Sequence, residues 1–373
     1  MPNHKNNSID RRCSFLTLRL QFVVPCGNRP RENIFLPDKI AVAVVGVGVF
    51  GRNHARVYRE LEQQGEPVRL LGVVDSDLDR ADAVAREFGC HAFGSVEQML
   101  TTHSEIKAAS VASPTVHHLE VARALMKQGV DVLIEKPLAA SLAEADELVK
   151  FAAAHKRIAQ AGHLERFNPA VRATLPLLTQ PMFFEVHRLS VFTPRSLDVD
   201  VVLDLMIHDL DIVLSFANSP VKEVRAVGLP ILSGKVDIAN VRLEFESGCV
   251  ANFTASRVST ERVRKLRFFQ PHQYVSVDYG RQEVLVFTVG VEGAASGAPT
   301  VNPQINVAKP PVTSEEPLHA ELKAFLQAVR ERSTPVVPLE DGRRALALAL
   351  EIVVAIREHG KKVGLGGLAR AKG

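Results

Sequence analysis

The chain has 373 residues, and at roughly 150 residues per domain this length predicts two domains. Apolar residues make up 46% and charged residues 23%, which is typical of a soluble globular protein and argues against a disordered chain. The net charge of +3 is small and the charges are interspersed, which argues against a nucleic-acid partner. No apolar run approaches the roughly 18 residues of a membrane span, so we expect no membrane partner.

The cysteines and the first residues indicate a cytoplasmic protein. Cys13, Cys26, Cys90 and Cys249 are scattered, without the spacing of a disulfide framework or a zinc site, which favours a reducing compartment. Polar residues interrupt the apolar stretch of residues 1–38, and no small-residue cleavage site follows it, so this range does not fit a secretion signal. We expect residues 1–38 to be a disordered leader or a mis-assigned start.

A dinucleotide-binding motif opens the first expected domain. The apolar run 40–45 predicts a strand covered on both faces, and residues 52–61 predict a helix. Between them stands Gly-x-Gly-x-x-Gly. Gly46 permits the tight turn, Gly48 lets the backbone approach a pyrophosphate, and Gly51 lets helix and strand pack closely. The N-terminus of the helix would then face the phosphates.

A second strand, residues 68–74, ends at Asp75, about where the ribose-binding acid of such domains is expected. A carboxylate there accepts both adenosine ribose hydroxyls and repels a 2′-phosphate. No arginine follows Asp75 directly, so the sequence favours NAD, while Arg80 is close enough to keep NADP open.

Strands and helices continue to alternate up to Ala161, which predicts a doubly wound parallel sheet over residues 39–161. One strand, residues 108–112, leads into Ser113-Pro114, with His117 at the start of the next helix. A later apolar run, 132–134, ends in Glu135-Lys136-Pro137. Charged groups rarely end a buried strand unless something binds there, and ligands of such sheets lie at the carboxyl ends of the strands.

Residues 162–363 predict a second domain, α/β in class, with a largely antiparallel open sheet. Its expected strands lie between residues 182 and 289, and residues 290–313 read as a loop rich in Gly, Ala and Pro. The last helix, 341–359, is a candidate to pack back on the first domain.

The most reactive set of this domain lies on the helix expected over residues 204–216. Asp204 and His208 are four residues apart and share a face, with Asp211 next along. A histidine that titrates near neutrality suits the removal of a hydroxyl proton during hydride transfer, and Lys136 could hydrogen-bond the same oxygen.

Plainer interpretations remain open for these residues. Asp204 and His208 could be a satisfied core pair, or could ligate a metal with Asp211, although no further ligand completes the shell. Lys136 could extend from a strand end to water. The arginines and lysines of residues 257–267 read as water-facing strand residues or as a site for a substrate phosphate.

Together these residues resemble the glucose–fructose oxidoreductase / inositol dehydrogenase (Gfo/Idh/MocA) family over residues 40–363. The resemblance rests on the glycine motif, on Glu135-Lys136-Pro137, on Asp204-x-x-x-His208, and on Glu321-Leu322-x-x-Phe325. It implies that Lys136, Asp204 and His208 are catalytic and that the second sheet forms a homodimer or homotetramer. One departure is Asp198-Val199-Asp200-Val201-Val202, where many members carry a glycine-rich stretch.

Within the family, the run from His163 to Pro169 and the run 198–211 look most like nucleotide-sugar members. The implied reaction is NAD-dependent oxidation of a sugar hydroxyl, for example the 3-hydroxyl of UDP-N-acetylglucosamine. A free sugar or polyol such as inositol as substrate, and a non-catalytic dinucleotide-binding regulator, stay open as alternatives.

The expected substrate contacts are His163, Arg166, Asn168, Asp204 and His208. The expected cofactor contacts are Gly46, Gly48, Phe50, Gly51, Asp75, Ser113, Pro114, His117, Glu135 and Lys136. No metal is expected.

Overall fold

The computed structural model describes residues 39–193, 199–291 and 303–364. The expectation for residues 1–38 therefore lies outside the described residues. Residues 38–373 cluster as one compact unit, which contains two β-sheets.

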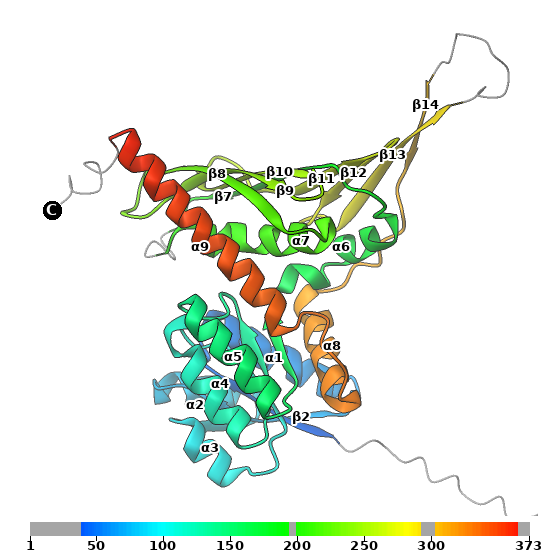
Figure 1. Ribbon diagram of the computed structural model, residues 1–373. Coiled ribbons are helices and arrows are strands. Elements are labelled where there is room, and N and C mark those ends of the chain that lie inside the picture. Colours follow the sequence, from blue (N-terminus) through cyan, green and yellow to red (C-terminus); the bar gives the residue numbers. More distant parts are fainter. Residues whose placement is uncertain (1–38, 194–198, 292–302, 365–373) are drawn as a thin grey trace, which may run out of the picture. The chain divides into compact units, whose positions relative to one another are not determined.

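The first sheet has six strands in the order β3-β2-β1-β4-β5-β6, and every neighbouring pair is parallel (Figure 1). This order is that of a Rossmann domain, so the predicted doubly wound sheet is confirmed. The strands are β1 (Ile40–Val45), β2 (Val68–Val74), β3 (His91–Phe93), β4 (Ala108–Val111), β5 (Asp131–Glu135) and β6 (Ala159–Gly162). All residues of β1, β4, β5 and β6 are buried, as the continuous apolar runs required.

Helices connect these strands. Side-chain caps start several of them: Asp77 accepts the Arg80 N–H at the start of α2, and Ser141 accepts the Glu144 N–H at the start of α5. The helical segments are α1 (Val49–Gln63), α2 (Leu78–Phe88), α3 (Val96–Thr102), η1 (Thr115–His117), α4 (His118–Lys127) and α5 (Leu142–Ala154).

The second sheet has eight strands in the order β14-β13-β12-β11-β7-β10-β9-β8. Only β7 and β10 pair in parallel, so the largely antiparallel sheet is confirmed. The strands are β7 (Phe183–Val191), β8 (Val221–Leu229), β9 (Ile238–Phe245), β10 (Val250–Ser259), β11 (Val263–Gln270), β12 (Gln273–Asp278), β13 (Glu283–Val291) and β14 (Pro303–Ala308). The last of these, β14, lies in the stretch that we expected to be a loop. The expectation missed it because its surroundings are rich in Gly, Ala and Pro and its pairing with β13 is long-range.

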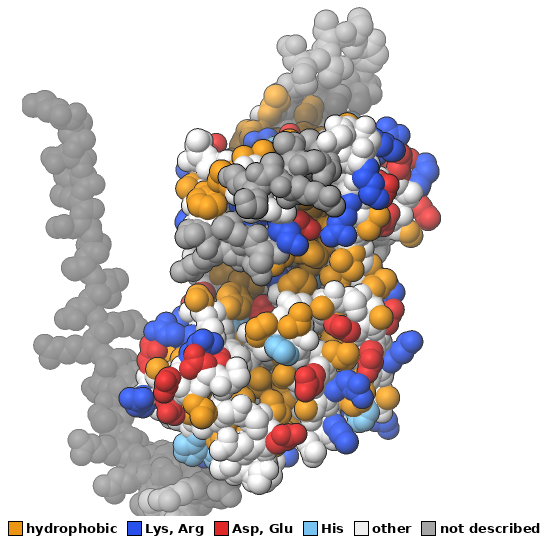
Figure 2. All heavy atoms as spheres, turned by 90° about the vertical axis from the view of Figure 1, so that its left-hand side faces the viewer, with side chains coloured by type: hydrophobic (Ala, Val, Ile, Leu, Met, Phe, Trp, Pro, Cys, Tyr) orange, Lys and Arg blue, Asp and Glu red, His pale blue; other side chains and the backbone are white. Residues whose placement is uncertain are grey.

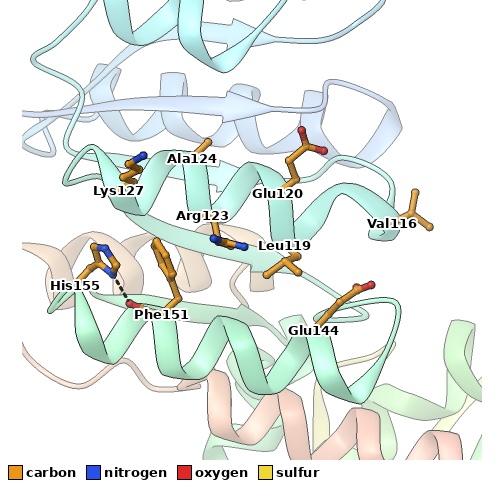
Figure 3. A pocket seen from close by; sticks show the side chains of 9 residues that line it. All are labelled: Val116, Leu119, Glu120, Arg123, Ala124, Lys127, Glu144, Phe151 and His155. Atoms are coloured by element: carbon orange, nitrogen blue, oxygen red, sulfur yellow. Dashed lines mark hydrogen bonds between the residues drawn. The ribbon is translucent and has the colours of Figure 1, made fainter.

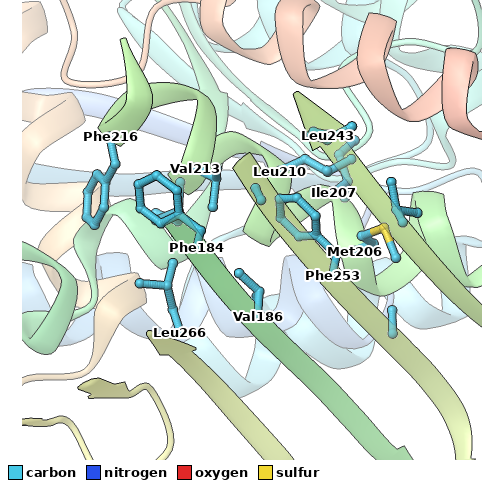
Figure 4. Packing of buried hydrophobic residues seen from close by; sticks show 14 of the residues in the cluster. Phe184, Val186, Met206, Ile207, Leu210, Val213, Phe216, Leu243, Phe253 and Leu266 are labelled. Carbon is cyan, nitrogen blue, oxygen red and sulfur yellow. The ribbon is translucent and has the colours of Figure 1, made fainter. Parts of the chain in front are cut away.

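One face of this sheet is covered by helices, as Figure 1 shows for α6, α7 and α9. Alternate residues of β7, β10 and β11 point to that face and form the core in Figure 4, where Phe184, Phe253 and Leu266 meet Leu210 and Val213 of α7. The helical segments after β6 are η2 (Leu164–Phe167), α6 (Pro169–Thr174), η3 (Leu175–Leu177), η4 (Val202–Met206), α7 (Ile207–Ala217), α8 (Pro317–Glu331) and α9 (Leu339–Lys362).

Two features of these helices bear on the site. The helix expected over residues 204–216 begins instead as the π-helical segment η4, a widened turn of a kind that often occurs at functional sites. The last helix, α9, contacts both sheets. Its Gly342 leaves so little room that a Cβ there would lie 2.7 Å from Cβ of Ala161 in β6, and Ile356 packs near Gly228 of β8. Among the described residues, no helix combines the length and apolarity of a membrane span.

Candidate active site

In the loop between β1 and α1, the backbone is open at Gly48, where a pyrophosphate is expected, and crowded at Gly46 and Gly51. A Cβ on Gly46, whose φ is +83°, would lie 2.4 Å from the Ser113 nitrogen, and a Cβ on Gly51 would lie 1.8 Å from the Gly46 oxygen. A Cβ on Gly48 would meet no atom within 4 Å. Gly48 also precedes the first turn of α1, and no side chain caps that turn. The open space and the free N–H groups fit a bound dinucleotide.

Asp75 is fixed at the end of β2 by this same loop. Its Oδ2 accepts the Val47 N–H at 2.9 Å, and its Oδ1 accepts the Asp77 N–H at 3.0 Å. Arg80 lies 3.3 Å from Asp75 and 2.9 Å from Asp77, so the guanidinium is already paired with both carboxylates. This placement suits a ribose with free hydroxyls, as in NAD.

Ser113 and Pro114 follow β4 beside Gly46, whereas His117 is exposed at the end of η1 and Phe50 is exposed at the start of α1. The sequence did not separate His117 from its neighbour His118. In the structure His118 is buried, with Nε2 2.9 Å from the Ser113 carbonyl oxygen and Nδ1 3.1 Å from that of Pro137. It therefore ties together the ends of β4 and β5, and burial lowers the pKa of its imidazole.

Lys136 and Asp204 meet, although 68 residues separate them. Lys136 Nζ donates to the Asp204 carbonyl oxygen at 2.7 Å and lies 3.6 Å from Asp204 Oδ1. The Lys136–Pro137 peptide bond is cis. Burial lowers the pKa of Lys136, and the charges of Asp204 and Glu135 act in the opposite direction. Asp204 thus holds Lys136 at the carboxyl end of β5.

His208, in the first turn of α7, lies beside Lys136. Burial lowers the pKa of His208 well below its usual value, and the positive charges of Lys136 and Arg188 act in the same direction. The imidazole is therefore neutral at neutral pH, and its Nδ1 is buried without a partner among the described residues. No hydrogen bond joins it to Asp204 within the described ranges.

The three expected substrate contacts after β6 have different surroundings. His163 is 2% exposed, its Nδ1 has no described partner, and it lies within electrostatic range of His208. Arg166 instead contacts Asp211, Ser215 and Asp341, each at 2.7 Å.

Asn168 is 3% exposed and caps α6 by accepting the Ala170 N–H. Its Nδ2 donates to the backbone carbonyl oxygen of Tyr279. Arg166 and Asn168 are thus hydrogen-bonded within the chain, and their contact with a substrate stays a prediction. Asp211 pairs with Arg166.

The sequence did not predict a buried cluster of charged side chains around Arg188. Arg188 of β7 donates to Asp209 Oδ2 at 2.6 Å and Oδ1 at 3.0 Å, and to Glu165 Oε1 at 3.0 Å. Its guanidinium also lies 5.4 Å from the ring centre of Tyr279. The signal was an arginine at a core-facing position of an alternating strand, and a second acid, Asp209, beside His208.

Other surface features lie away from these residues. A groove of about 490 Å³ runs between α4 and α5, lined by residues such as Glu120, Arg123 and Phe151 (Figure 3) and by none of the candidate catalytic residues. Basic and acidic side chains are interspersed over the described part of the face in Figure 2. Within the described ranges, no three His, Cys, Asp or Glu side chains gather in a way that could hold a metal ion.

Comparison with known proteins agrees with this architecture. The family model described as "Oxidoreductase family, NAD-binding Rossmann fold" matches residues 40–163, and the GFO/IDH/MocA C-terminal domain matches residues 181–271. UDP-N-acetylglucosamine 3-dehydrogenase of Acidithiobacillus ferrooxidans is 38% identical over 84% of this chain and 96% of its own length. Inositol 2-dehydrogenase 1 of Saccharopolyspora erythraea is 30% identical over 50% of this chain and 56% of its own length.

A solved structure of the Acidithiobacillus ferrooxidans enzyme superposes with a TM-score of 0.77 at 34% identity and covers 85% of this chain and 98% of that chain. Levoglucosan dehydrogenase in complex with NADH shares the fold, with a TM-score of 0.74 at 16% identity over 86% of this chain and 98% of its own. The fit of the glycine loop and Asp75 to NAD agrees with the family's cofactor. This chain belongs to the Gfo/Idh/MocA family of NAD-dependent oxidoreductases.

Proposed function

We propose that this protein is an NAD-dependent dehydrogenase that oxidises the 3-hydroxyl of UDP-N-acetylglucosamine or of a closely related nucleotide sugar. For the substrate, the supporting observation is the 38% identity to a UDP-N-acetylglucosamine 3-dehydrogenase over 96% of that enzyme's length. For the chemistry, support comes from Lys136, held by Asp204 beside the neutral imidazole of His208.

In this mechanism, bound NAD supplies the hydride acceptor. The loop from Gly46 to Gly51 and Asp75 would hold it. Lys136 donates a hydrogen bond to the reacting oxygen and stabilises the negative charge that develops there. His208 accepts the hydroxyl proton while the C–H bond breaks and the carbon becomes a ketone. Asp204 holds the Lys136 ammonium in place, and His163 lines the same site.

A substrate panel tests the proposal directly. UDP-N-acetylglucosamine, other UDP-sugars, free sugars and inositol are each supplied with NAD, and NADH formation is followed by absorbance. We expect the largest kcat/KM with UDP-N-acetylglucosamine. Faster oxidation of inositol would overturn the proposed substrate but keep the dehydrogenase chemistry. Tight NAD binding without NADH formation from any alcohol would contradict the enzymatic role and favour a regulator.

The proton-accepting role of His208 predicts the pH dependence of turnover. Because burial lowers the pKa of His208, its neutral form persists at pH values where an exposed histidine is already protonated. We therefore expect the acid limb of the kcat profile to fall below pH 6.5, the ordinary value for histidine. Steady-state rates across the acidic range measure the limb, and circular dichroism confirms that the chain stays folded there. A midpoint at or above 6.5 would contradict this role.

We also propose that the uncovered face of the second sheet joins two copies of the chain. A row of stacked rings crosses this face, with Phe269 and Tyr274 centred 4.8 Å apart and Tyr274 and Phe287 5.0 Å apart. Beside it, Ile305 is 66% exposed. Such apolar surface is typical of an interface. Light scattering should give a dimer or tetramer, and Ile305→Lys with Leu285→Lys should yield monomers; a monomeric unmodified chain would refute the proposal.

The cytoplasm is the proposed compartment. Cys90 and Cys249 are both free thiols, which supports a reducing environment. Cell fractionation tests this proposal, and recovery of the protein from the medium or the periplasm would contradict it.

A further inference from the structure

A chain of buried polar side chains lies behind Lys136. Tyr58 Oη is 2.9 Å from Ser110 Oγ, Ser110 Oγ is 3.0 Å from His54 Nδ1, and His54 Nε2 is 3.0 Å from Glu135 Oε1. Tyr58, Ser110 and His54 are fully buried and Glu135 is 7% exposed. Three elements, α1, β4 and β5, supply these four side chains from within an otherwise apolar core. A buried polar chain of this kind is costly unless every donor finds an acceptor.

The direction of the hydrogen bonds follows from the number of hydrogens. Burial raises the pKa of Tyr58, so its hydroxyl keeps its hydrogen and donates to Ser110, its one described partner. Ser110 Oγ has one hydrogen and two lone pairs, so it can accept from Tyr58 and also donate to His54 Nδ1. An ionised carboxylate only accepts hydrogen bonds, so His54 Nε2 is the donor to a Glu135 carboxylate.

A second buried acid lies next to this chain. Glu321 of α8 is fully buried, and neither of its carboxylate oxygens has a partner among the described residues. Burial raises the pKa of Glu321 well above the usual range, and the charge of Glu135 acts in the same direction. Glu321 is therefore protonated at neutral pH. Of the two acids, Glu135 is the one that receives the His54 hydrogen bond, and such a donor favours the carboxylate form.

The carboxylate of Glu135 lies close to the backbone of the catalytic lysine. Its Oε2 accepts the Lys136 backbone N–H at 3.3 Å, and Gly162 of β6 leaves space for the carboxylate, since a Cβ there would lie 2.8 Å from Oε1. The charged and titratable groups around Lys136 are Glu135 on β5, Asp204 on η4, Arg188 on β7 and His208 on α7. Two of them are anions, and only Glu135 is anchored by a buried chain of hydrogen bonds.

We propose that His54 is a positioning residue that holds Glu135 as a fixed anion beside Lys136, so that Lys136 enters the reaction as an ammonium and not as a neutral base. This inference rests on the role given to Lys136 in the proposed function. It gives a role to two residues, His54 and Ser110, that do not contact the substrate in that mechanism.

The test measures the titration of Lys136 in the whole protein without any substrate. Lysines are labelled competitively with acetic anhydride at a series of pH values, and mass spectrometry gives the labelled fraction of Lys136. In Glu135→Gln we expect the midpoint to fall by about one pH unit, because a nearby opposite charge is lost. In His54→Leu, Glu135 loses its donor and we expect a shift in the same direction. An unchanged midpoint in Glu135→Gln would overturn the proposal.

Three further variants separate positioning from general structural damage. His54→Gln keeps an N–H donor for Glu135 and should restore most of the midpoint, whereas Tyr58→Phe alters only the far end of the chain and should leave it unchanged. Glu321→Gln replaces a protonated acid by a neutral isostere and should also leave it unchanged. A shift in Glu321→Gln as large as that in Glu135→Gln would place the charge on both acids and overturn the assignment. Thermal unfolding confirms that each variant is folded.

The labelling result does not depend on which alcohol the enzyme oxidises. If no nucleotide sugar is turned over but the Lys136 midpoint falls in Glu135→Gln and His54→Leu, the proposed substrate fails and the positioning of Glu135 stands. If nucleotide sugars are oxidised and the midpoint stays fixed in both variants, the reverse holds.

Discussion

Replacing Lys136 by methionine is expected to lower kcat by about 10²- to 10³-fold, the usual cost of removing a donor that stabilises charge on a reacting oxygen. Methionine keeps most of the side-chain volume but supplies no hydrogen bond. NAD affinity should change little, because the glycine loop and Asp75, the proposed cofactor contacts, lie at other strand ends. Calorimetry measures NAD binding, and NADH absorbance measures turnover. Near-normal kcat in this variant would remove Lys136 from the mechanism.

A matched control is available on the same domain. Lys127, in the last turn of α4, is exposed and lines the groove between α4 and α5, away from the strand ends. Lys127→Met makes the same chemical change and should leave both kcat and NAD affinity as they were. A loss of activity in both variants would indicate a general effect of lost positive charge, so the comparison isolates the position of Lys136.

The first domain was predictable from the sequence because short stretches of neighbouring residues indicate its strands, turns and helix starts. The run from Ile40 to Gly51 contains a strand, a turn and a helix start within a dozen residues, and Gly46 and Gly51 each meet a steric limit that the structure displays. Asp75 and Lys136 follow from the same rule, since parallel strands end at one edge of the sheet. The signal here is periodicity and glycine placement, which neighbouring residues determine.

The second domain was less predictable because its pairings are long-range. Arg188 finds Asp209 and Glu165 only after β7, α7 and η2 have come together, and no spacing in the chain indicates this. Arg166 was expected from the sequence as a substrate contact, and its pairing with Asp341, 175 residues away, was not foreseen. The π-turn of η4, which includes Asp204, has no sequence signature that we used.

Arg188→Met is expected to lower the free energy of unfolding by about 3–5 kcal/mol, because it leaves two buried carboxylates without their cation. Arg188 is 4% exposed and donates to both Asp209 and Glu165. The control lies on the same pair of strands: Arg267 of β11 contacts Glu185 of β7 at 3.0 Å, with both side chains more than a third exposed. Arg267→Met should therefore cost under about 1 kcal/mol. Urea unfolding at neutral pH measures both values.

The pH dependence distinguishes loss of charge pairing from loss of packing. Burial already raises the pKa of Asp209, with Arg188 acting in the opposite direction, so removing Arg188 must raise that pKa further. A carboxyl whose folded-state pKa lies above its unfolded value destabilises the fold while it is ionised, and this cost disappears as the pH falls through the folded value. The stability difference between the variant and the unmodified chain should therefore narrow on acidification. A difference that stays constant from neutral to acidic pH would mean that lost packing around the side chain, and not the two unpaired carboxylates, causes the destabilisation.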